Sequence, residues 1–126
     1  MRLLLDTHAL IWALAQPRRL PARVAASVRD PENSVCLSAA STWEIAIKST
    51  LGKISADVDE IVRAARDAGF DELPISVAHT IRVRQLPLHH RDPFDRVLVA
   101  QAIEEGLTVV THDVAFRAYG APTLWG

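Results

Sequence analysis

The sequence has only one cysteine, Cys36, so no disulfide bond can form within the chain. It has no apolar run long enough to span a membrane: Asp6 interrupts the N-terminal apolar stretch early, and no signal-peptidase-like site follows. It also lacks an excess of either charge, with a net charge of −1, so a nucleic-acid binder would have to concentrate its basic residues locally. These absences favour a reducing, cytoplasmic location without a membrane segment.

The chain is long enough to form a hydrophobic core without support from disulfide bonds. Its 126 residues, of which 49% are hydrophobic, suit one globular domain spanning 1–126. A chain of this length buries roughly two-thirds of the surface of its unfolded form. Cys36 lies in an apolar run, where a buried, unreactive thiol is expected.

Short apolar runs alternate with longer helical patterns. Residues 2–5 are a continuous apolar run, which predicts a strand covered on both faces. Further strands are predicted at 35–38, 72–75, 108–111 and, at an edge, 122–125. Helices are predicted at 8–15, 21–29, 41–53, 57–68, 76–86, 93–105 and, briefly, after Asp113. This alternation predicts an α/β fold with a mostly parallel sheet of four to five strands flanked by helices.

Several acidic residues lie near the predicted junctions between strands and helices, and each has an ordinary structural explanation. Asp6 could form a turn or cap, although Thr7 can cap the following helix without it. Glu44 fits a capping box in which Ser41 is the cap. Asp113 could cap the short helix that follows it.

The segment "DPFDR" at 92–96 holds one more acid than capping requires. Asp92 precedes a proline and is an ordinary N-cap. Asp95 then lies in the first turn, where the helix dipole favours an anion by ~0.3–1 kcal/mol. Two carboxylates three residues apart on one helix face repel each other, so capping alone does not explain the pair.

Taken together, the acids predict a metal site. Asp6, Glu44 and Asp113 follow the first, second and fourth predicted strands, whose carboxyl ends share the edge of a parallel sheet where ligands bind. Asp95 begins the helix that leads into the fourth strand. Carboxylates gathered there would raise one another's pKa values unless a cation lay among them. Oxygen ligands without cysteine favour Mg²⁺ or Mn²⁺, which can activate water against a phosphodiester.

The sequence resembles a PIN domain, and within that family the VapC toxins of bacterial and archaeal toxin–antitoxin operons. The matching segments are "LLLDTHALIW" (3–12), "SAASTWEIAIKSTLGKI" (38–54), "LPLHHRDPFDRVLVAQAIEEGLTVVTHD" (86–113) and Phe116. They are spread over almost the whole chain, and their order and spacing make the resemblance specific. The pattern DPFDR-x-L-x-AQA is the most specific single piece.

The resemblance implies a three-layer α/β/α PIN fold and an endoribonuclease that needs Mg²⁺ or Mn²⁺ and cuts tRNA, rRNA or mRNA. It also implies inhibition by a small VapB-type antitoxin, and a homodimer. The four acids of the family fall on Asp6, Glu44, Asp95 and Asp113. Asp6, Asp95 and Asp113 are then the expected metal ligands, while Glu44 either ligates the metal or acts through water. Supporting positions fall on Thr7, Asp92 and Thr111.

Contacts to RNA require other residues, because carboxylates repel phosphate. Flanking basic residues are the candidates, namely Arg18, Arg19, Lys48, Lys53, Arg91 and Arg96. The tryptophans at positions 12, 43 and 125 could stack on bases, although aromatic residues in apolar runs more often lie in a core or interface. The histidines at positions 89, 90 and 112 lack the spacing of a zinc site, and no cysteine joins them.

Two alternatives remain open. A phosphoryl-transfer or receiver module also places acids beside Mg²⁺. The phosphohydrolase form needs D-x-D after the first strand, where this sequence has "DTH", and a receiver needs a late lysine, whereas no lysine follows Lys53. An inactive PIN-like domain that only binds a partner is separated from an enzyme by an activity assay alone.

Overall fold

The computed structural model describes residues 1–87 and 92–126, and within them it shows a five-stranded sheet. All neighbouring strands are parallel, in the order β3-β2-β1-β4-β5. The strands are β1 (Arg2–Leu5), β2 (Ser34–Ser38), β3 (Asp71–Leu73), β4 (Thr108–Val110) and β5 (Thr123–Leu124). The predicted α/β fold with a parallel sheet is confirmed.

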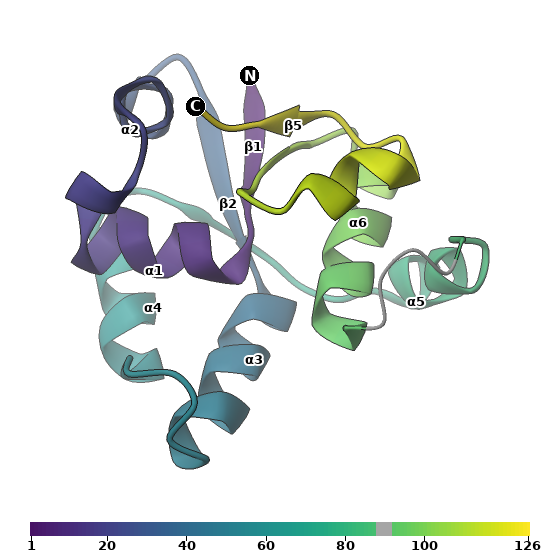
Figure 1. Ribbon diagram of the computed structural model, residues 1–126, viewed down its shortest axis with the longest axis horizontal. Coiled ribbons are helices and arrows are strands. Elements are labelled where there is room, and N and C mark those ends of the chain that lie inside the picture. The colour runs from purple at the N-terminus through teal and green to yellow at the C-terminus, as the bar shows by residue number, and fades with distance from the viewer. Residues whose placement is uncertain (88–91) are drawn as a thin grey trace.

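Helices cover both faces of the sheet and complete the three layers (Figure 1). The α-helices are α1 (Thr7–Ala15), α2 (Ala22–Arg29), α3 (Ala39–Thr50), α4 (Val58–Asp67), α5 (Val77–Arg84) and α6 (Pro93–Glu105). Two short 3₁₀ helices are η1 (Pro17–Arg19) and η2 (Val114–Tyr119). In the described ranges, none of the helices combines the length and the apolar character needed to cross a bilayer.

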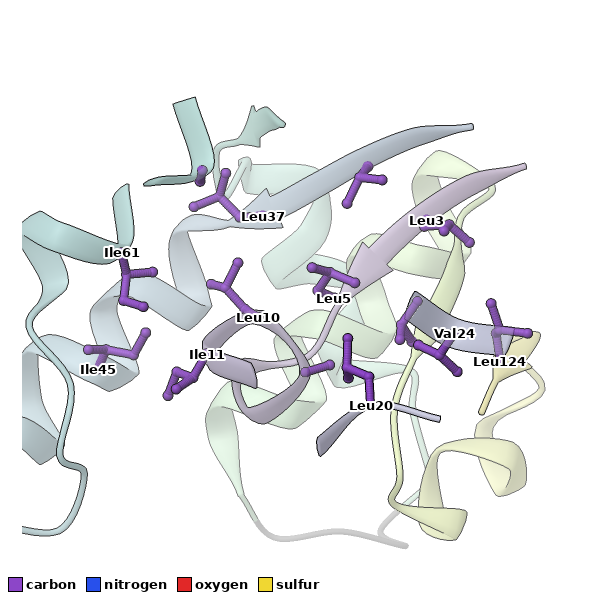
Figure 2. Close-up of a cluster of buried hydrophobic side chains, with 14 residues drawn as sticks. Leu3, Leu5, Leu10, Ile11, Leu20, Val24, Leu37, Ile45, Ile61 and Leu124 are labelled. Atoms are coloured by element: carbon purple, nitrogen blue, oxygen red, sulfur yellow. The ribbon is translucent and has the colours of Figure 1, made fainter. Parts of the chain in front are cut away.

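The central strand β1 divides the core into two clusters. Leu3 and Leu5 pack with residues of α1, α2 and α4 on one face (Figure 2). Leu4 points to the other face and packs with α6 and η2. All three leucines are 0% exposed, which confirms that this strand is covered on both faces.

The starts of α1 and α3 differ from the sequence-based expectation. Asp6, not Thr7, caps α1, and its Oδ1 accepts a hydrogen bond from a backbone amide of the first turn at 2.8 Å. Ser38, not Ser41, caps α3, because the helix begins directly where β2 ends. Glu44 therefore lies beyond the first turn of α3 and belongs to no capping box.

The start and end of α6 agree with the prediction. Asp92 is the N-cap, and its Oδ1 accepts hydrogen bonds from the backbone amides of Phe94 and Asp95 at 2.8 and 3.2 Å. The helix ends at Gly106, whose φ of +66° suits a residue without a Cβ. Residues 98–102 are all buried, so α6 is a core helix that carries Asp95 on its first turn.

A buried polar network ties α6 to its neighbours. The Ser38 hydroxyl donates to Gln101 Oε1 at 2.5 Å, and Gln101 Nε2 donates to the Pro74 carbonyl at 3.3 Å. His79 accepts a backbone hydrogen bond at Nδ1, so its neutral ring donates from Nε2 to Glu105 at 2.9 Å. These bonds fix α6 against α5 and against the junction of β2 and α3.

Cys36 is half-buried on β2 rather than fully buried. Burial raises the pKa of its thiol, and the negative charge of Asp71 raises it further. The thiol is therefore protonated at neutral pH, which agrees with the expected low reactivity.

Replacing Gln101 by Met should lower the free energy of unfolding by roughly 1–3 kcal/mol, because the buried hydroxyl of Ser38 would lose the acceptor for its proton. Urea denaturation measures this change. The matched control is Q85M, at the exposed C-cap of α5, which should shift the free energy by less than about 0.5 kcal/mol. Equal effects of the two substitutions would contradict the role given to the network.

Candidate functional site

The candidate site lies at the carboxyl ends of the central strands. Asp6 directly follows β1, Asp113 follows the neighbouring strand β4, and Glu44 lies on the helix after β2. The backbone amide of Asp6 donates to the Val110 carbonyl at 3.0 Å, which fixes the end of β1 against β4. The chain passes from β1 to β2 on one side of β1, and it later adds β4 on the other side. The strand order therefore reverses between β1 and β4, and parallel sheets bind ligands at such a switch point.

Asp6 is a buried carboxylate, 7% exposed. Burial raises its pKa above the ordinary value, and the charge of Glu44 adds to this rise. Hydrogen bonds from Thr111 and from the amide of Ala9, together with His8, act in the opposite direction but do not cancel the effect of burial. The ionised form of Asp6 is therefore poorly compensated by the protein, and a cation beside it would stabilise that form.

Asp6 and Asp113 open into the same hollow. It measures about 260 Å³ and is lined by Asp6, His8, Trp12, His112 and Asp113. Asp6 caps α1, His8 and Trp12 lie on that helix, and the other two residues come from the segment that follows β4. The structure thus brings the first and last of the predicted acids to one cavity.

Thr111 links these two acids. Its side chain is buried and forms a hydrogen bond with Asp6. Its hydroxyl oxygen also accepts a hydrogen bond from the backbone amide of Asp113 at 3.0 Å. Asp113 in turn caps η2, with Oδ1 accepting from the amide of Ala115 at 2.9 Å. The supporting position predicted for Thr111 therefore lies between two of the predicted site acids.

Glu44 is 4% exposed and both of its carboxylate oxygens are engaged. Oε1 accepts a hydrogen bond from the Thr7 hydroxyl at 2.5 Å, and Oε2 pairs with Lys48 Nζ at 2.5 Å. Thr7 Oγ1 also lies 3.2 Å from Ser41 Oγ, so the start of α1 is fixed against α3. The sequence predicted Thr7 as a supporting residue but did not predict this partner.

Lys48 joins α3 to the start of α6. Its Nζ lies 3.8 Å from Asp92 Oδ2 and 5.8 Å from the centre of the Phe94 ring. The hydrogen bond to Glu44 is the largest effect on the pKa of Lys48 and raises it, burial opposes this, and the charges of Asp92 and Asp95 add to the rise. Asp95 therefore lies within electrostatic reach of the ammonium group.

The four predicted acids form a series of neighbours at one end of the sheet. The charge of Glu44 acts on Asp6, which shares a hollow with Asp113, while Lys48 pairs with Glu44 and is also affected by the charge of Asp95. In the ranges 1–87 and 92–126, no three side chains of Asp, Glu, His or Cys converge closely enough to hold a metal ion. The donors themselves, carboxylate oxygens that include the poorly compensated Asp6, suit a hard divalent cation.

The basic candidates differ in what they contact. Arg96 donates to three backbone carbonyls near the end of α5, at 2.8, 3.0 and 3.4 Å, so it holds α6 to α5. Lys48 is engaged by the acids, a contact that the i,i+4 spacing from Glu44 could have indicated. Arg91, His89 and His90 lie outside the described residues.

The tryptophans occupy two different environments. Trp12 packs against Trp125 with ring centres 6.0 Å apart, and the Arg19 guanidinium lies 4.3 Å from the centre of the Trp12 ring. Trp12 also lines the hollow. Trp43 is 53% exposed, and its ring meets Phe94 edge-on at 4.9 Å.

The sequence profile of the PIN domain matches residues 3–122. The chain belongs to the PIN domain family. Ribonuclease VapC22 of Mycobacterium tuberculosis (strain ATCC 25618 / H37Rv) is 29% identical over 131 residues, which cover 97% of each chain. The predicted resemblance to PIN domains and VapC proteins is thus confirmed, and the receiver and phosphohydrolase alternatives do not agree with this family.

Solved structures share the fold. One is VapBC2 from Rickettsia felis bound to a DNA fragment from their promoter, with a TM-score of 0.71, 17% identity and full coverage of both chains. Another is FitAcB from Neisseria gonorrhoeae, with a TM-score of 0.63 and 23% identity, covering 97% of this chain and 96% of that one. At these identities the likeness concerns the PIN fold of this chain alone.

Replacing Asp6 by Asn should raise the melting temperature of the protein in chelator at neutral pH. Asn keeps the capping oxygen and removes a charge that burial disfavours. Because the pKa of Asp6 is raised on folding, the stability it contributes is complete below the ordinary carboxyl pKa of about 3.9 and is lost as the pH rises through the raised value. The gain should thus be large at about pH 8 and small at about pH 4.

Thermal denaturation of wild type and D6N in EDTA over this pH series measures the effect. The control is D59N, which removes an exposed carboxylate from the first turn of α4 and should show no such pH-dependent gain. A D6N protein that melts below wild type at every pH would mean that the charge of Asp6 stabilises the fold.

Proposed function

We propose that this protein is a VapC-type endoribonuclease that depends on Mg²⁺ or Mn²⁺ and is neutralised by a VapB-type antitoxin. The observation that carries the proposal is the buried Asp6 at the switch point of the sheet, which interacts with Glu44 and shares a hollow with Asp113. Membership of the PIN domain family and the similarity to a protein named Ribonuclease VapC22 support it.

The carboxylates of Asp6, Asp95 and Asp113 would hold the cation, and Glu44 would act on it directly or through water. When bound, such a cation supplies Lewis-acid activation of water and offsets the charge that develops on the phosphate. The four acids match the donor chemistry because each offers carboxylate oxygens, which Mg²⁺ and Mn²⁺ prefer.

The chain's own residues hold these groups in place. Thr7 and Lys48 fix the carboxylate of Glu44, so it can accept a proton from an attacking water in a constant orientation. Thr111 fixes Asp6. The buried run of α6 and the bonds of Arg96 to α5 restrict the first turn on which Asp95 lies.

RNA and the antitoxin are the proposed partners, in a cytoplasmic homodimer. Arg19, which packs on the Trp12 ring that lines the hollow, is a candidate for contact with phosphate. An arginine of the antitoxin entering the acidic site would supply positive charge in place of the cation. Several structures that share this fold are of VapBC pairs, including VapBC-1 from nontypeable Haemophilus influenzae.

Replacing Asp95 by Asn should lower the rate of RNA cleavage in Mg²⁺ by at least about a hundredfold, since a charged oxygen ligand is lost. The cap of α6 is formed by Asp92, so D95N should keep the fold. The rate is measured by gel electrophoresis of a mixed tRNA and rRNA substrate with purified, antitoxin-free protein, and excess EDTA should abolish it.

D59N serves as the control for lost negative charge and should cleave like wild type. Circular dichroism should give the same helix content for all three proteins. Cleavage by D95N at the wild-type rate would refute the proposed site, and a wild type that cleaves no RNA would favour the inactive, partner-binding alternative.

A further inference from the structure

We propose that Lys48 is a positioning residue that keeps Glu44 out of direct contact with the metal and balances the charge of the acids in the metal-free protein. The inference rests on the proposed function of this site. It commits Glu44 to orienting water, and it gives Lys48 a role distinct from binding RNA.

The first support is the way in which Glu44 is held. One carboxylate oxygen accepts from the Thr7 hydroxyl and the other from the Lys48 ammonium, each at 2.5 Å. Charge-assisted bonds of this kind are short and strong, so they fix the direction of the carboxylate. A carboxylate has further lone pairs, which remain able to accept a hydrogen bond from water. Direct ligation of a metal would instead require competition with an ammonium group already in place.

The second support is the position of Lys48 between two helices. It starts on α3, reaches Asp92 Oδ2 at 3.8 Å, and lies 5.8 Å from the centre of the Phe94 ring at the start of α6. The ring of Trp43, which is also on α3, makes a T-shaped contact with the same Phe94 ring. The lysine side chain is 30% exposed, so the ammonium is held by both helices while it still meets solvent.

The third support is the local charge. Glu44, Asp92 and Asp95 all act on Lys48, which therefore offsets part of the negative charge around it. Removing this positive charge should strengthen the attraction of the acids for a divalent cation and, at the same time, release Glu44 from its orientation. Metal affinity and cleavage rate should then change in opposite directions. A lysine that only contacted RNA phosphate would raise KM and leave the metal affinity unchanged.

The test begins with Mn²⁺ binding to the full chain, measured by calorimetry without RNA. K48Q should bind Mn²⁺ about three- to tenfold more tightly than wild type. K48R keeps the positive charge, so its affinity for Mn²⁺ should stay close to that of wild type. The matched control is K53Q, which removes the same charge from an exposed lysine after α3 and should also stay close to wild type.

A double substitution separates the two possible roles of Glu44. K48Q/E44Q removes both charges of the pair, so its Mn²⁺ affinity should return close to wild type if Glu44 acts through water. If Glu44 were a direct ligand, the double variant would bind Mn²⁺ at least about tenfold more weakly than wild type. That result would overturn the inference.

Cleavage of RNA at saturating Mn²⁺ is the second readout. K48Q should lower kcat by about tenfold or more with little change in KM, and K48R should restore most of it. An unchanged or weaker Mn²⁺ affinity in K48Q, or equal effects of K48Q and K53Q, would overturn the role of Lys48. If D95N abolishes cleavage while K48Q has no effect, only this inference fails. If the wild-type protein binds no Mn²⁺, both this inference and the proposed function fail.

Discussion

The cost of burying the Asp6 carboxylate is the constraint on which the arrangement of this site depends. The side chain lies at the end of β1, the central strand, whose leucines are fully covered on both faces. Water cannot solvate it well there, so its charge must be compensated by neighbours. The protein supplies a hydrogen bond from Thr111 and a helix amide, yet the pKa of Asp6 remains raised. The position of this one residue in the sheet therefore leaves a carboxylate whose ionised form a nearby positive charge would stabilise.

The rest of the fold fixes groups around that position. The β1–β4 pairing brings Thr111 and Asp113 to the same edge as Asp6, although they lie far apart in the sequence. On the other side, Ser38 ends β2 and its hydroxyl binds Gln101 of α6. This hydrogen bond therefore connects the start of α3, which carries Glu44, with α6, which carries Asp95. Helices and strands fixed in this way can hold like charges close together, whereas flexible loops would move apart to relieve the repulsion.

Much of this fold could be predicted from the sequence because its signals are local. The continuous apolar run of β1 predicted a covered strand, and Asp92 before Pro93 predicted the start of α6. The caps at Thr7 and Ser41 were wrong although the ends of both strands were predicted correctly, because α1 and α3 begin at once after β1 and β2, without the intervening residues that the prediction assumed. The i,i+4 spacing of Glu44 and Lys48 could have indicated their ion pair, which was not predicted, but the contact of Lys48 with Asp92 depends on the packing of α3 against α6, which no local pattern contains.

Capping and a functional role are compatible explanations for an acid at the start of a helix. Asp6 and Asp113 each cap a helix through Oδ1, and the cap does not require the second oxygen. A cap fixes the carboxylate at the start of its helix, which in a parallel sheet is the edge where ligands bind. In the proposed metal site, the capping hydrogen bond would also orient the carboxylate, so no separate element would be required for that purpose. It also explains why the acids look ordinary one at a time: the geometry that makes each a good cap is the geometry that brings Asp6 and Asp113 to one hollow.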